Sequence, residues 1–107
     1  MEIREEKIGD VDVLVPLARV DSSSAKAFEA KVLAVINGGA PKIVIDFSEL
    51  DYISSAGLRV VLVGAKMTRG GRKFVLCSMK PHIREIFDVS GFARILTIFP
   101  DRQTALD

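Results

Sequence analysis

Short runs of apolar residues alternate along the chain with segments whose apolar residues recur every three or four positions. The first run, residues 11–20, is rich in β-branched side chains and predicts a buried strand. Pro16 has no amide hydrogen, so it requires an edge position, a bulge or a break in that strand. The charged residues 2–8 allow an edge strand at best. Further strands are predicted at residues 42–46, 72–78 and 95–99.

The segments with helical spacing are bounded by residues that start and stop helices. Residues 21–24 supply cap-type side chains, and Asn37 with two glycines ends the helix that follows. Further helices are predicted from about Ser55 to Arg69, from Pro81 to Gly91 and over residues 101–107. Strands that alternate with helices predict an α/β fold with a mixed or parallel sheet. The residues between the strand at 42–46 and Ser55 are interpreted as a loop.

The helix predicted after Ser54 carries two apolar stripes instead of one. One consists of Leu58, Val61, Leu62 and Ala65, and the other, roughly opposite, of Val60, Val63 and Met67. A helix between the sheet and another element would bury both stripes, which is the commoner arrangement. The second stripe, flanked by Arg59 and Lys66, is also typical of a surface patch for a partner protein. Because so small a chain has little else to cover it, the patch is the favoured interpretation.

Composition narrows the class of protein. A chain of 107 residues fits one domain spanning residues 1–107. A net charge of +1 provides no strong positive potential that would attract nucleic acid or an anionic membrane. The single cysteine, Cys77, excludes an internal disulfide and favours a reducing compartment. The chain has neither a signal-like start nor an apolar run of about 18 residues, so we expect a cytoplasmic protein without a membrane span.

Few groups in the sequence suit catalysis or cofactor binding. There is no P-loop, no dinucleotide-binding pattern and no G-x-S-x-G motif, and His82 is the only histidine. We therefore expect no metal, no cofactor and no enzymatic activity. An enzyme would require a pocket lined by Asp21, Asp46, Asp51 and Ser55.

Two adjacent serines, Ser54 and Ser55, lie where the helix after the loop should begin. Serine is a favoured N-cap because its hydroxyl accepts a hydrogen bond from an amide two or three residues later. A serine at such a place also suits phosphorylation, since the helix dipole and the unpaired first-turn amides favour a phosphate. Local sequence leaves both roles open for both serines.

Three segments, in order, resemble STAS domains, specifically the stand-alone anti-sigma factor antagonists of bacterial partner-switching systems. They are GDVDVLVPLARVDSSSAKAFEAKV, KIVIDFSELDYISSAGLRVVL and GGRKFVLCSMKPHIREIFDVSGFARIL. The resemblance covers nearly the whole chain. It implies a small mixed β-sheet flanked by helices and a regulatory function without turnover.

The resemblance also implies a phosphorylation site and two partners. In the family, the serine that corresponds to Ser55 is phosphorylated by a GHKL-type serine kinase that also serves as an anti-sigma factor. The unphosphorylated antagonist binds this kinase and frees the sigma factor, phosphorylation breaks the complex, and a PP2C-type phosphatase restores it. The residues expected to contact the partner are Asp21, Ser54, Ser55, Ala56, Gly57, Arg59, Val60, Val63 and Met67.

Two positions depart from the family pattern. Ser54 stands where members often have aspartate, which makes it the secondary candidate for phosphorylation, and Ala18 stands where they often have glycine.

An alternative function is an adaptor subunit of a sensory or transport complex, in which no phosphorylation occurs.

Overall fold

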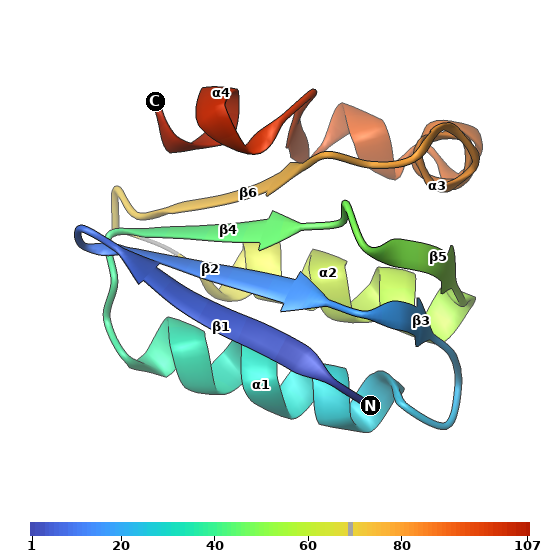
Figure 1. The fold of residues 1–107 in the computed structure, drawn as a ribbon, viewed down its shortest axis with the longest axis horizontal. Coiled ribbons are helices and arrows are strands. Elements are labelled where there is room, and N and C mark those ends of the chain that lie inside the picture. Colours follow the sequence, from blue (N-terminus) through green and yellow to red (C-terminus); the bar gives the residue numbers. More distant parts are fainter. Residues whose placement is uncertain (69) are drawn as a thin grey trace.

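A five-stranded β-sheet forms the centre of the protein in the computed structural model, which describes residues 1–68 and 70–107 (Figure 1). Its strands, in spatial order, are β1 (Ile3–Ile8), β2 (Val11–Pro16), β4 (Lys42–Asp46), β6 (Lys73–Cys77) and β7 (Thr97–Phe99). β1 is an edge strand antiparallel to β2, and the remaining neighbours pair parallel. The predicted α/β fold with a mixed sheet is confirmed.

Helices cover both faces of this sheet. They are α1 (Ala25–Asn37), α2 (Ser55–Met67), α3 (Pro81–Ser90) and α4 (Arg102–Leu106), with a 3-10 turn, η1, at Phe92–Arg94. α1 and α2 lie side by side against one face, whereas α4 lies over the other (Figure 1). The predicted helices are present, although α2 ends at Met67, where Thr68 donates its hydroxyl to the Gly64 carbonyl. Arg69, the predicted end, lies outside the described residues.

The alternating side chains of β2 give each face of the sheet a core of its own. Leu14 points to the side of α1 and α2 and belongs to the larger hydrophobic cluster with Phe28. Its neighbours Val13 and Val15 point the opposite way, into a smaller cluster that includes Ala105 of α4. Both helical layers are therefore required to remove the sheet from water.

Pro16 ends β2, and the chain then starts a second, two-stranded sheet. β3 (Ala18–Val20) pairs parallel with β5 (Leu50–Ile53), which the sequence had led us to interpret as a loop. Ala18 turns the chain between β2 and β3 with φ 65°, a backbone conformation that favours glycine. This small sheet positions the functional site, because β3 leads into α1 and β5 leads directly into α2 (Figure 1).

Candidate functional site

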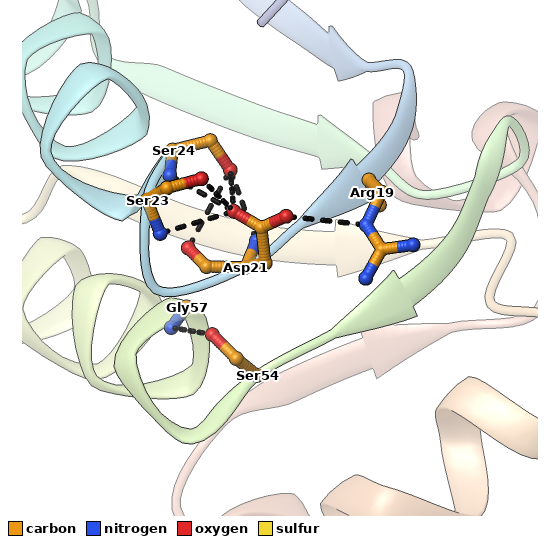
Figure 2. Close-up of polar contacts among 6 residues, drawn as sticks. All are labelled: Arg19, Asp21, Ser23, Ser24, Ser54 and Gly57. Atoms are coloured by element: carbon orange, nitrogen blue, oxygen red, sulfur yellow. Dashed lines mark hydrogen bonds and ion pairs between the residues drawn. The ribbon is translucent and has the colours of Figure 1, made fainter.

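Ser54 joins β5 to α2 and is fixed on both sides. Its extended backbone, φ −85° and ψ 171°, makes it the N-cap, and its Oγ accepts a hydrogen bond from the Gly57 amide at 3.2 Å (Figure 2). Its own amide donates to the Val20 carbonyl at 2.8 Å. Ser54 therefore caps the helix and ties its first turn to the end of β3.

Ser55 is the first residue of α2, and its side chain is exposed. Among the described residues, the Ser55 hydroxyl has no hydrogen-bond partner. The amides of Ser55 and Ala56 have no acceptor within the helix, because they belong to its first turn. The two serines, equivalent as caps in the sequence, thus differ in the structure: one is a bonded cap and the other presents its hydroxyl to solvent.

Gly57 allows α2 to approach β3 and β5 closely. A Cβ atom at this position would lie 2.8 Å from Ile53 Cγ1 and 2.9 Å from Val20 Cγ1, nearer than real Cβ atoms come. Gly57 is buried and offers little surface to a partner, and the predicted partner contact at this residue stays a prediction. Gly57 sets the position of the neighbouring serines by packing.

Asp21 lies one residue beyond the Val20 carbonyl that Ser54 contacts. Its Oδ1 accepts hydrogen bonds from the Ser23 hydroxyl at 2.7 Å and from the Ser23 and Ser24 amides, each at 3.0 Å (Figure 2). Its Oδ2 accepts from Arg19 Nε at 3.2 Å. The hydrogen bonds from Ser23 and Ser24 hold the pKa of Asp21 well below its ordinary value of 3.8. A fixed carboxylate thus flanks the start of α2.

The outward side of α2 differs from the predicted patch. Arg59 and Met67 are exposed and Val63 is half-buried, but Val60 is 5% exposed and belongs to the main core. The prediction that Val60 forms part of a surface patch is therefore wrong. Leu62, which the sequence assigned to the core stripe, is half-buried and borders this outward side.

Packing against α1 explains the error at Val60. This residue lies one turn from two buried glycines, Gly57 and Gly64, and so faces the same way as they do. A Cβ at Gly64 would meet Val32 of α1 at 3.0 Å and Phe74 of β6 at 2.7 Å. The neighbouring helix thus covers a side of α2 that the sequence seemed to leave open. We call the remaining residues, Ser55, Ala56, Arg59, Leu62, Val63 and Met67, the outward face of α2.

Polar residues beside the serines extend this surface across β5. Tyr52 is 43% exposed, and the Arg19 guanidinium lies 4.9 Å from the centre of its ring. Asp51 is ion-paired with Lys80, and its carbonyl oxygen lies 2.6 Å from Nε2 of His82. The sequence did not indicate this cluster, because it forms only where α3 packs on β5.

The carboxylates proposed for an enzyme pocket have separate partners. Asp46 is buried and bound by Arg102 of α4, Asp51 pairs with Lys80, and Asp21 is bound within its own turn. The part of the chain that the structure describes contains no group of three or more histidine, cysteine or acidic residues placed to hold a metal ion. Within the same residues, no helix has the length and apolar character needed to cross a membrane.

Comparison with known proteins identifies the family. Residues 2–105 match the model of the STAS domain. The chain therefore belongs to the STAS domain family, as the resemblance of its three segments predicted.

Individual relatives narrow the class further. The chain is 41% identical over 106 residues to BtrV of Bordetella bronchiseptica, a protein assigned as an anti-sigma factor antagonist, and the match covers 98% of this chain and 91% of BtrV. This relationship places the protein among the anti-sigma factor antagonists, which are regulators rather than enzymes.

Solved structures share the fold at lower identity. The crystal structure of an anti-sigma factor antagonist from Mycobacterium paratuberculosis has a TM-score of 0.93 at 23% identity, over 98% of this chain and 90% of that chain. The antagonist SpoIIAA in its unphosphorylated form has a TM-score of 0.83 at 21% identity, over 99% and 94%. Bacillus SpoIIAA in its phosphorylated form has a TM-score of 0.75 at 21% identity, over 99% and 97%.

Proposed function

We propose that this anti-sigma factor antagonist is the phosphorylation-controlled member of a cytoplasmic partner switch. In its unphosphorylated form it binds a GHKL-type serine kinase that acts as an anti-sigma factor, and so frees the sigma factor. Phosphorylation of Ser55 releases the kinase, and a PP2C-type phosphatase restores the binding form.

The observation that carries this proposal is the difference between Ser54 and Ser55. A kinase needs a hydroxyl that reaches its ATP without unfolding the substrate. The Ser55 hydroxyl is exposed and has no partner among the described residues, whereas Ser54 Oγ accepts the Gly57 amide. Modification of Ser54 would break the helix cap, which makes Ser55 the better acceptor. The solved phosphorylated form of SpoIIAA supports the reading by analogy of fold.

The transfer itself is ordinary phosphoryl chemistry supplied by the kinase. The Ser55 oxygen bonds to the γ-phosphorus of ATP as the bond to ADP breaks, and a base of the kinase takes the hydroxyl proton. The product carries a charge of about −1.5 to −2 at the first turn of α2. There the helix dipole tolerates it, so the fold survives the modification.

Release of the partner follows from where this charge lies. Ser55 lies at the N-terminal end of the outward face of α2. The apolar part of this proposed interface consists of the half-buried Leu62 and Val63 and the exposed Met67. A partner that covers this face would remove the phosphate from water, and a dianion whose charge is not fully balanced is costly to desolvate. The ionised carboxylate of Asp21 on the adjoining turn carries a charge of the same sign as the phosphate and adds to the negative charge that the partner would cover.

Pull-down from the source cell's extract tests the proposal with wild type, Ser55→Ala and Ser55→Asp as baits. We expect an ATP-binding kinase to be retained by Ser55→Ala and lost with Ser55→Asp. Equal recovery by both baits would contradict the switch and favour the adaptor function. Ser54→Ala is the matched control and should retain the kinase.

Mapping of the modified residue gives an independent test. Wild-type protein is incubated with the captured kinase and ATP, and its phosphopeptides are identified by mass spectrometry. We expect phosphate on Ser55. Phosphate only at sites outside Ser54 and Ser55 would overturn the proposal.

A further inference from the structure

Arg59 lies one helical turn after Ser55, on the outward face of α2. Residues four apart on a helix have Cβ atoms about 5–6 Å from each other, within reach of a long side chain. Arg59 is exposed, and among the described residues its guanidinium makes no ion pair or hydrogen bond. A cation without a partner therefore stands next to the proposed phosphorylation site.

Two other cations close to the serines are already paired. Arg19 of β3 binds the Asp21 carboxylate at 3.2 Å and also lies over the Tyr52 ring. Lys80, at the start of α3, is ion-paired with Asp51 of β5. Each of these cations would have to leave a carboxylate to reach a phosphate on Ser55, whereas Arg59 would not.

We propose that Arg59 is the intramolecular counter-ion of a phosphate on Ser55, an inference that rests on the proposed phosphorylation of this serine. An anionic group four residues before a cation is the favourable order on a helix. The planar guanidinium donates two parallel hydrogen bonds to phosphate oxygens, which a lysine ammonium does not reproduce.

This pairing makes Arg59 the residue that couples the modification to the interface. Before phosphorylation, Ser55 and Arg59 together carry a charge of +1. Phosphate adds about −1.5 to −2, so the sum becomes about −0.5 to −1. At the same time the guanidinium is drawn toward the first turn and away from a partner. Phosphorylation thus reverses the sign of the net charge at this end of the outward face and also draws its cation away from the partner.

The test measures the phosphate directly and needs no kinase. Phosphoserine is incorporated at position 55 during synthesis of the full chain, and its second ionisation is followed by phosphorus NMR. The variants are Arg59→Gln, Arg59→Lys and, as a matched control, Arg94→Gln, which removes an exposed arginine of η1. Because the helix amides are the same in all four proteins, the differences report the side chains alone.

We expect the phosphate pKa to rise by about 0.15 to 0.4 of a unit in Arg59→Gln relative to wild type. Arg59→Lys should restore part of this shift, and Arg94→Gln should titrate like wild type. Identical titration of wild type and Arg59→Gln would overturn the pairing, as would an equal shift in Arg94→Gln. These outcomes do not depend on a kinase, so failure here is distinguishable from a failure to find phosphate on Ser55 after incubation with kinase.

Discussion

The two serines at the start of α2 contribute differently to the stability of the fold. Loss of a serine N-cap costs about 1 kcal/mol, since an amide of the first turn loses its acceptor. Exposed side chains without partners contribute within about 0.5 kcal/mol. We therefore expect Ser54→Ala to lower the free energy of unfolding by about 1 kcal/mol and Ser55→Ala to change it by less than about 0.5 kcal/mol. Urea denaturation of the two variants beside wild type measures both values. Equal losses in the two variants would show that the capping hydrogen bond does not distinguish the serines.

Local sequence could not have separated these two residues. Both are good caps, and which of them takes that role depends on where the backbone leaves the extended conformation of β5. That point is set by the hydrogen bond that the Ser54 amide donates to the carbonyl of Val20, a residue more than thirty positions earlier. The family resemblance assigned the modification to Ser55 without this geometry.

At the scale of elements, the sequence predicted helix ends correctly where cap residues, glycines or a proline mark them. Gly38 and Gly39 end α1, and Pro81 and Gly91 bound α3, as expected. The missed strand, β5, has no such local signal. It is a strand because Pro16 ends β2 and creates β3, whose backbone groups then require a partner.

The contact of α2 with the two-stranded sheet depends on the missing side chain at Gly57. In Gly57→Ala, the new methyl group overlaps the stiff branched side chains of Ile53 and Val20, and overpacking of this kind costs about 1–3 kcal/mol. Alanine returns at most about 1 kcal/mol of helix propensity. We expect a net loss of about 1 kcal/mol or more in thermal or urea unfolding, together with weaker binding of the proposed partner kinase, because the first turn must shift.

Ser55→Ala is the control that separates the loss of stability from the loss of binding, since it changes the same turn without a steric overlap. A Gly57→Ala protein as stable as wild type would show that α2 moves freely against β3 and β5. Retained kinase binding in a destabilised variant would show that the position of the serines tolerates the shift.

At the scale of the whole molecule, Arg102 joins three elements that are far apart in the sequence. Its Nε donates to Asp46 of β4 at 2.9 Å, and its two terminal nitrogens donate to both carboxylate oxygens of Glu6 at 3.0 Å each. These contacts hold α4 over the smaller core. The sequence predicted α4 itself but not these contacts, because pairs separated by 56 and 96 residues leave no periodic pattern.

Removal of this guanidinium should destabilise the fold more than removal of a surface arginine. Arg102→Met keeps an apolar stem but leaves Asp46, 3% exposed, without its cation. An unsatisfied buried polar group costs about 1–3 kcal/mol, which we expect as the loss in urea unfolding. Arg84→Met is the matched control, because among the described residues Arg84 pairs only with the exposed Asp88, and such pairs contribute about 1 kcal/mol or less. Similar losses in the two variants would contradict a structural role for the Arg102 network.

Acid should reduce the difference between wild type and Arg102→Met. The hydrogen bonds from Arg102 hold the pKa of Glu6 below its ordinary value of 4.5. A carboxylate whose pKa is lowered in the folded state stabilises the fold above its unfolded pKa, and this stabilisation is lost as the pH falls through the folded value. Asp21 also has a lowered pKa, but its turn is intact in both proteins, so its contribution cancels in the difference. The difference in unfolding free energy, measured with urea at a series of pH values, should stay constant from about pH 7 to pH 5 and shrink below 4.5. A difference that persists unchanged to about pH 3 would mean that the ionisation of Glu6 is not linked to Arg102.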